Sequence, residues 1–75
     1  MVKDIFRPGN SLRVKSMDYN HTASKMLVDM GITPGTLIFV DNTAPLGEPV
    51  VISVRNYKLA IRQKDLRALK LEKVA

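Results

Sequence analysis

Apolar and charged side chains alternate over residues 11–17, with Leu12 and Val14 at the apolar positions. A period of two is typical of a strand that buries one face and exposes the other, so a half-buried strand is predicted here. Met17 falls out of this alternation. A bulge or the end of the strand is therefore expected near Ser16.

A second apolar pattern has a helical period. Apolar residues occur at i, i+3, i+4 and i+7, namely Ala23, Met26, Leu27 and Met30. This spacing predicts one stripe of a short helix, and the stripe is expected to be buried against the sheet as core; the alternative use of such a stripe is to line a cofactor pocket. Asn20 or Thr22 is expected to cap the helix by accepting a bond from an unpaired backbone N–H.

Residues 30–36 combine a helix stop, a tight turn and a strand start. Gly31 can take the left-handed conformation that ends a helix, and Ile32 follows at the position where a Schellman motif makes its hydrophobic contact. Pro34 and Gly35 then supply the fixed φ and the positive φ of a type II turn. The helix is therefore expected to end within a residue or two of Met30.

The strand predicted over residues 36–43 is the strongest in the chain, and both of its faces begin with apolar residues. Such a strand is covered on one side by the interior of the domain and on the other by the helix or by a partner. Phe39 is expected in the core.

Val50, Ile52 and Val54 form one face of the next predicted strand, over residues 50–55. Asn56 is expected to take positive φ in the turn that follows. The last predicted elements are a hairpin strand over residues 59–62, a single helical turn over 64–67 and a closing strand over 69–73. Several short strands separated by turns are typical of a small antiparallel β-barrel, so the predicted fold class is mainly β.

The chain has 75 residues and no cysteine. This length predicts a single domain over residues 1–75 with a thin core. The lack of cysteine excludes disulfides and thiolate metal sites and suits a reducing compartment. No apolar run approaches the roughly 20 residues that cross a bilayer, and the first residues lack a signal pattern. A soluble, cytoplasmic protein is expected.

The 12 Lys and Arg residues outnumber the 7 Asp and Glu residues, which gives a formal net charge of +5. A basic excess fits nucleic acid, an anionic membrane surface or an acidic protein partner. The charges are interspersed along most of the chain, and only residues 62–73 are visibly rich in cations.

Catalytic and metal-binding patterns are not found in the sequence. His21 is the one histidine, and no cluster of Cys, Asp or Glu surrounds it, so it is interpreted as a surface or helix-capping residue rather than a metal ligand. There is no nucleophile–base pair, no paired carboxylates and no Gly-rich phosphate loop. The chain is therefore predicted to be non-enzymatic, with no cofactor and no metal site.

Two segments carry candidate partner contacts. Pro45 and Leu46 lie in a Pro/Gly loop, where an apolar tip is either folded over the end of the barrel or offered to a partner. Tyr57 stands between Arg55 and Lys58, where the ring either contacts a partner or lies over its own hairpin. These five residues are the predicted partner-binding site.

Three segments in order resemble the ferrous-iron transport protein A (FeoA) family: LVDMGITPGT over residues 27–36, APLGEP over 44–49 and VRNYKLAIR over 54–62. The early Arg-Pro-Gly at residues 7–9 also fits, so the resemblance covers nearly the whole chain. Asn56 stands where the family usually has Gly, and Asn is the other residue that readily takes positive φ.

The resemblance implies an SH3-like antiparallel β-barrel with one short α-helix between the first two barrel strands. It also implies a cytosolic accessory role in bacterial ferrous-iron uptake, through interaction with the cytosolic part of the membrane permease FeoB. The same domain ends iron-dependent repressors of the diphtheria-toxin-repressor type, but no helix-turn-helix precedes it here, so the transporter accessory is expected. With no Cys and one His, the chain is not expected to carry iron itself.

A small basic barrel that binds nucleic acid is the alternative function. RNA-binding barrels usually place aromatic platforms among their cations, and this chain has only two Phe and two Tyr residues. Nucleic acid is therefore not the expected partner. The sequence leaves open whether the protein self-associates and which surface of the permease it contacts.

Overall fold

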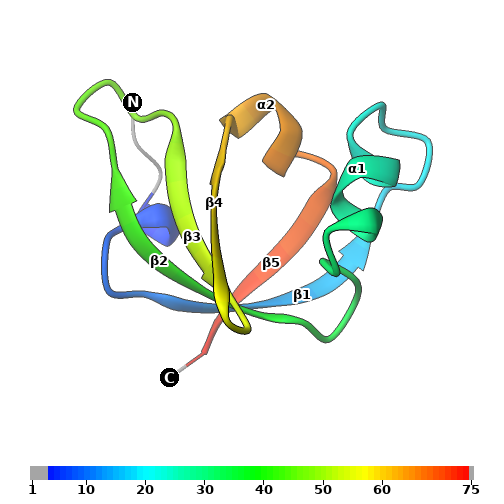
Figure 1. The fold of residues 1–75 in the computed structure, drawn as a ribbon, viewed down its shortest axis with the longest axis horizontal. Helices are drawn as coiled ribbons and strands as arrows, with labels where there is room; N and C mark the ends of the chain where they lie inside the picture. Colours follow the sequence, from blue (N-terminus) through cyan, green and yellow to red (C-terminus); the bar gives the residue numbers. More distant parts are fainter. Residues whose placement is uncertain (1–3, 75) are drawn as a thin grey trace.

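The computed structural model describes residues 4–74 (Figure 1). Its elements in chain order are η1 (Asp4–Phe6), β1 (Ser11–Met17), α1 (Ser24–Asp29), β2 (Leu37–Thr43), β3 (Val50–Val54), β4 (Tyr57–Ile61), α2 (Gln63–Leu66) and β5 (Leu69–Val74). The predicted strands, the single helical turn near residue 64 and the helix between the first two strands are all present. The predicted mainly β, SH3-like class is confirmed.

The five strands form one curled antiparallel sheet in the order β4-β3-β2-β1-β5 (Figure 1). Every neighbouring pair is antiparallel. No ladder joins β4 to β5 within residues 4–74, so the barrel is open between these two edge strands, and the short helix α2 connects them. A fully closed barrel would have no sheet edge, whereas β4 and β5 are edge strands here.

The core is built from the inward-facing positions of the strands. Leu12 and Val14 on β1 and Val50, Ile52 and Val54 on β3 are all at most 1% exposed, as their alternation predicted. The pairing of β1 with β5 shifts register between residues 14 and 16, which places the bulge where the out-of-phase Met17 predicted it. Alternation of apolar residues was thus a reliable guide on these two strands.

The expectation for Phe39 is wrong. Ile38 and Val40 are the inward residues of β2, at 2% and 0% exposure, so the pleat turns Phe39 outward with 43% of its surface exposed. Leu37, on the same outer face, is 56% exposed. The apolar character of both faces of β2 therefore does not mean that both are covered in this chain.

The apolar stripe of α1 is only partly buried. Leu27 is fully buried, as expected, whereas Met26 is 36% exposed and Met30 is half-buried. The helix has six residues, so few of its positions can face the core, and Met26 lies at the margin of its buried face. The expectation that the whole stripe is core is wrong for Met26.

The N-terminus of α1 is not capped by either of the two predicted residues. The N-cap residue is Ala23, which has no side-chain cap, and neither Asn20 nor Thr22 takes this role. Instead the backbone N–H of Ala23 donates to Nδ1 of His21 at 3.0 Å. The hydroxyl of Ser24 donates to the carbonyl of Tyr19 at 3.0 Å. His21 therefore lies at the start of the helix, in agreement with its interpretation as a surface or helix-capping residue.

The C-terminus of α1 forms a complete Schellman motif at Gly31. The N–H of Gly31 donates to the carbonyl of Val28 at 2.9 Å, and the N–H of Ile32 donates to that of Leu27 at 2.8 Å. These are the two bonds that define the motif, and Gly31 takes the positive φ it needs, 87°. Leu27 and Ile32 are both 0% exposed, so the accompanying hydrophobic pair lies in the core.

The predicted turn over residues 33–36 follows directly. The N–H of Thr36 donates to the carbonyl of Thr33 at 3.0 Å, and Gly35 has a φ of 93°. In the hairpin between β3 and β4, however, the residue with positive φ is Arg55, at 57°, and not Asn56. A two-residue hairpin loop needs positive φ at its first central position, and the pairing of Val54 with Tyr57 makes Arg55 that residue.

We expect Gly31→Ala to lower the free energy of unfolding by about 1–2 kcal/mol, the cost of a left-handed conformation for a residue with Cβ. An added Cβ would meet only the Tyr57 hydroxyl, at an ordinary 3.6 Å, so strain in the backbone and not a clash causes the loss. Denaturant melts of Gly31→Ala and Gly31→Asn test this. The asparagine variant should lose less, because Asn tolerates positive φ; equal losses would contradict the Schellman explanation.

Candidate interaction surface

The five predicted partner-binding residues lie at two opposite ends of the sheet. Pro45 and Leu46 are in the loop between β2 and β3, whereas Arg55, Tyr57 and Lys58 belong to the hairpin between β3 and β4. Since β3 runs from one end to the other, these groups are separated by the length of that strand, as Figure 1 shows. The structure does not bring the five residues into one site.

The loop between β2 and β3 is held by hydrogen bonds at each side of its tip. The N–H of Gly47 donates to the carbonyl of Ala44 at 2.8 Å, and the N–H of Ala44 donates to the carbonyl of Pro49 at 3.3 Å. From α2, the Gln63 amide Nε2 donates to the carbonyl of Gly47 at 2.5 Å. Arg62 Nη1 lies 4.0 Å from Glu48 Oε2. The loop is thus fixed to the neighbouring helix and closed on itself.

Leu46 stands at the tip of this loop with 91% of its surface exposed. Of the two alternatives for this residue, the structure adopts the one in which the side chain is offered to solvent. Hydrogen bonds from Ala44, Gly47 and Gln63 hold the loop backbone, which reduces the conformational freedom that a partner would have to restrict when it buries Leu46. An exposed apolar side chain on a fixed turn is a suitable anchor for a protein interface.

Tyr57 has a structural role at the other end of the sheet. Its half-buried ring packs against the core, and its hydroxyl lies close to Gly31 at the end of α1. That hydroxyl is buried and has no hydrogen-bond partner in the part of the chain that the structure describes. Nearby, Lys58 Nζ lies 3.4 Å from Asp41 Oδ2, which also accepts a bond from the Ser53 hydroxyl at 2.5 Å. The hairpin therefore offers a partner little apolar surface.

A second exposed apolar group lies on the outer face of β2. Leu37 pairs with Arg13, and Phe39 pairs with Ser11 and Ser53, so the two apolar side chains are surrounded by polar neighbours on adjacent strands. The sequence carried a signal for this surface, because both faces of the predicted strand began with apolar residues. Sequence reasoning did not select them, since it placed Phe39 in the core.

The described part of the chain contains no group of three His, Cys, Asp or Glu residues that could hold a metal ion. His21, the one histidine, already accepts a backbone hydrogen bond through Nδ1. Within residues 4–74, no helix is long and apolar enough to cross a membrane.

The family model and the solved structures that match this chain point to the same family. The family model of the FeoA domain matches residues 4–73. The structure of iron(II) transport protein A from Clostridium thermocellum is 31% identical with a TM-score of 0.81, over 89% of this chain. This chain spans only 41% of the length of that protein. An iron uptake regulatory protein (FeoA) is 30% identical, covers 99% of both chains and has a TM-score of 0.76.

A more distant structure supports the fold alone. FeoA from Stenotrophomonas maltophilia, complexed with zinc, is 20% identical with a TM-score of 0.75, over 88% of this chain and 82% of that one. It is described as a prokaryotic SH3 domain protein and as a candidate activating factor of bacterial ferrous-iron transport.

We expect Tyr57→Phe to leave the free energy of unfolding unchanged or to raise it slightly, because it removes a buried hydroxyl that lacks a partner. Tyr57→Ala should lower the same free energy by about 2 kcal/mol, since it also removes the packed ring. Thermal and denaturant melts of both variants measure this. A clear loss of stability in Tyr57→Phe would mean that the hydroxyl does form a stabilising bond.

Proposed function

This chain belongs to the FeoA domain family, and we propose that it is a cytoplasmic, non-enzymatic accessory protein of bacterial ferrous-iron uptake that acts by binding the cytosolic part of the permease FeoB. Membership of the family supports the link to iron uptake. The observation that carries the binding role is Leu46, an apolar side chain that is 91% exposed at the tip of a hydrogen-bonded loop.

Burial of Leu46 supplies a useful share of the binding energy. Complete burial of a leucine side chain is worth about 1.5–3 kcal/mol. Pro45 restricts the loop next to it, and the bond from Gln63 to Gly47 fixes the turn to α2. Little conformational entropy is therefore lost when the tip enters a pocket of the partner.

The net charge of +5 raises the rate at which this protein encounters an acidic surface of its partner. A positively charged domain approaches an acidic patch faster than a neutral one, and added salt screens this attraction. The apolar anchor then determines how long the complex lasts, because affinity differences within one interface lie mostly in the rate of dissociation.

We expect Leu46→Ser to weaken association with the cytosolic part of FeoB by about tenfold or more, the equivalent of about 1.5–3 kcal/mol of lost burial. The melting temperature should not change, since the side chain is already exposed. Binding is measured by pull-down and biolayer interferometry, and ferrous-iron uptake is measured in cells.

Val28→Ser is the matched control, because Val28 is also an exposed aliphatic residue, at 39%, but lies on α1. It should bind the permease as the unsubstituted protein does. If Leu46→Ser folds normally and also binds and supports uptake at the normal level, the contact lies on another surface, of which the outer face of β2 at Leu37 and Phe39 is the next to test.

Iron is the cargo of the pathway, and we predict that this protein has no tight site for it. Anaerobic calorimetry with ferrous iron should give no stoichiometric binding at sub-micromolar concentration. Weak binding through His21 or single carboxylates is compatible with the proposal. Tight one-to-one binding would overturn the proposed interaction role and indicate a carrier instead.

A further inference from the structure

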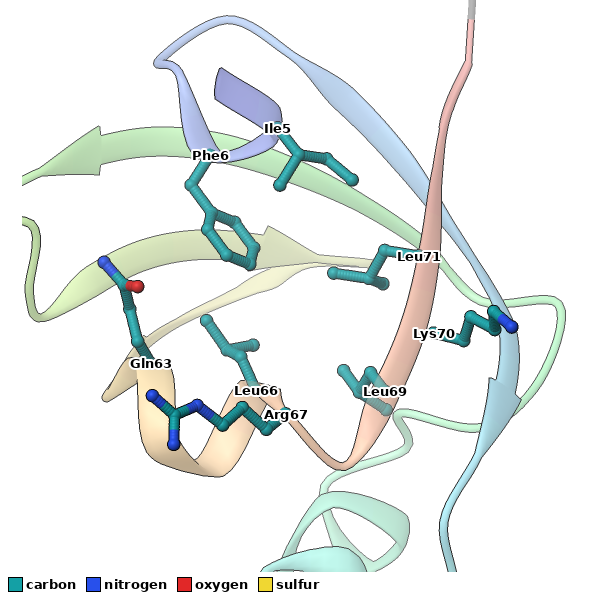
Figure 2. A pocket seen from close by; sticks show the side chains of 8 residues that line it. All are labelled: Ile5, Phe6, Gln63, Leu66, Arg67, Leu69, Lys70 and Leu71. Atoms are coloured by element: carbon teal, nitrogen blue, oxygen red, sulfur yellow. The ribbon is translucent and has the colours of Figure 1, made fainter. Parts of the chain in front are cut away.

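Two adjoining hollows lie beside β5 and share Ile5, and together they are called the seam below. The first, of about 390 Å³, is enclosed by η1, α2 and β5. The second, of about 440 Å³, lies beside it between Ile5, Arg7, Asn10 and Lys73. Figure 2 shows the first from close by: apolar side chains from these three elements point toward one another, whereas the Lys70 side chain points away from them on the other side of β5.

The floor of the first hollow is apolar. The apolar lining residues are Ile5, Phe6, Leu66, Leu69 and Leu71. Leu69 and Leu71 share one face of β5 because residues two apart on a strand point the same way. Their partner across the hollow is η1, so segments from both ends of the chain meet here. The space is wide enough to admit a leucine or phenylalanine side chain from another molecule.

The surroundings of this floor are cationic. The charged residues that line the two hollows are Arg7, Arg67, Lys70 and Lys73. Among residues 5–74, whose side chains the structure describes, no carboxylate lines either hollow and none forms an ion pair with these four cations. Arg13, Lys25, Lys58 and Arg62 form ion pairs on other faces, and Lys15, Arg55 and Lys64 are exposed cations elsewhere without a described ion pair. Positive charge without a described carboxylate partner is therefore not unique to the seam, but four such cations lie together there.

We propose that the seam is a docking site for a short acidic segment of a partner protein, which inserts one bulky apolar side chain into the hollow and places its carboxylates against the surrounding cations. Arg67, the C-cap of α2, lines the first hollow, and Lys73 on β5 lines the second. A peptide whose acidic residues flank a leucine or phenylalanine matches this arrangement in both charge and shape.

Other occupants fit these observations less well. A second copy of the chain would bring the same cations face to face, and like charges repel. Nucleic acid binds to such surfaces by stacking bases on exposed rings, and the one ring that lines the first hollow, Phe6, is only 6% exposed. An anionic membrane would require apolar side chains that project outward, whereas those of the seam line a depression.

The seam and the Leu46 loop are different surfaces, so a partner at the seam is independent of the proposed permease contact. The test of docking at the seam uses the full chain labelled with ¹⁵N and a synthetic probe peptide, acetyl-Glu-Asp-Glu-Phe-Leu-Glu-Asp-amide. Amide shifts on titration are expected to map to η1, α2 and β5 and to saturate. A control peptide with Ser in place of Phe and Leu should bind about tenfold or more weakly.

The charge contribution is tested with two matched double variants. Arg67→Glu with Lys73→Glu reverses two exposed cations of the seam and should weaken binding of the probe about tenfold. Lys15→Glu with Arg55→Glu changes the net charge equally, and these two exposed cations also lack a described ion pair, but they lie outside the seam. The control pair should bind nearly as the unsubstituted protein does.

Three outcomes would overturn the proposal. Shifts spread over the whole surface, or equal weakening by both double variants, would mean non-specific attraction by net charge. Equal binding of the Phe-Leu and Ser peptides would mean that the hollow is not used. Tighter binding of a single-stranded RNA oligonucleotide or of phosphatidylglycerol vesicles to the same residues would assign the seam to nucleic acid or to a membrane instead.

Discussion

The register of β2 on β1 is the constraint on which the rest of the sheet depends, and hydrogen bonds from the turn before β2 fix it. Gly35 N–H donates to the carbonyl of Val14 at 2.7 Å, and Val14 N–H donates to that of Thr36 at 3.0 Å. Both faces of β2 carry apolar side chains, so a slip by one residue would bury Leu37 and Phe39 with little hydrophobic penalty. The turn removes that ambiguity. β3 pairs with β2, β4 pairs with β3, and β5 pairs with β1. The positions of these three strands are therefore set relative to the β1–β2 pair.

Sequence reasoning succeeded where local chemistry decides the structure and failed where packing does. Gly31, the turn around Gly35 and the inward positions of β3 follow from backbone conformation and alternation, and all were predicted correctly. Phe39 was misplaced because the side of an apolar strand that faces inward is set by hydrogen bonds of the turn, not by the strand itself. Met26 was misplaced because a six-residue helix has little surface that can face the core.

The candidate surfaces were less accessible to prediction than the fold. The exposure of Leu46 depends on where the loop is held, and Gln63, which lies 16 positions away from Gly47, helps to hold it. The seam is harder still, because Ile5 and Leu71 come from opposite ends of the chain and meet only after the sheet has curled. The cation-rich stretch after residue 62 was visible in the sequence, but its position beside an apolar hollow was not.

The helix α2 contacts both surfaces, since Gln63 lines the seam and also donates to Gly47 in the Leu46 loop. This single bond can couple the binding affinities of the two surfaces only weakly. A typical intramolecular hydrogen bond contributes about 0.5–1.5 kcal/mol, so complete loss of it on one side would change affinity on the other by at most about tenfold. The two surfaces are therefore nearly independent in energy although they share a residue. A partner that engages both would gain mainly because the second contact becomes intramolecular once the first has formed.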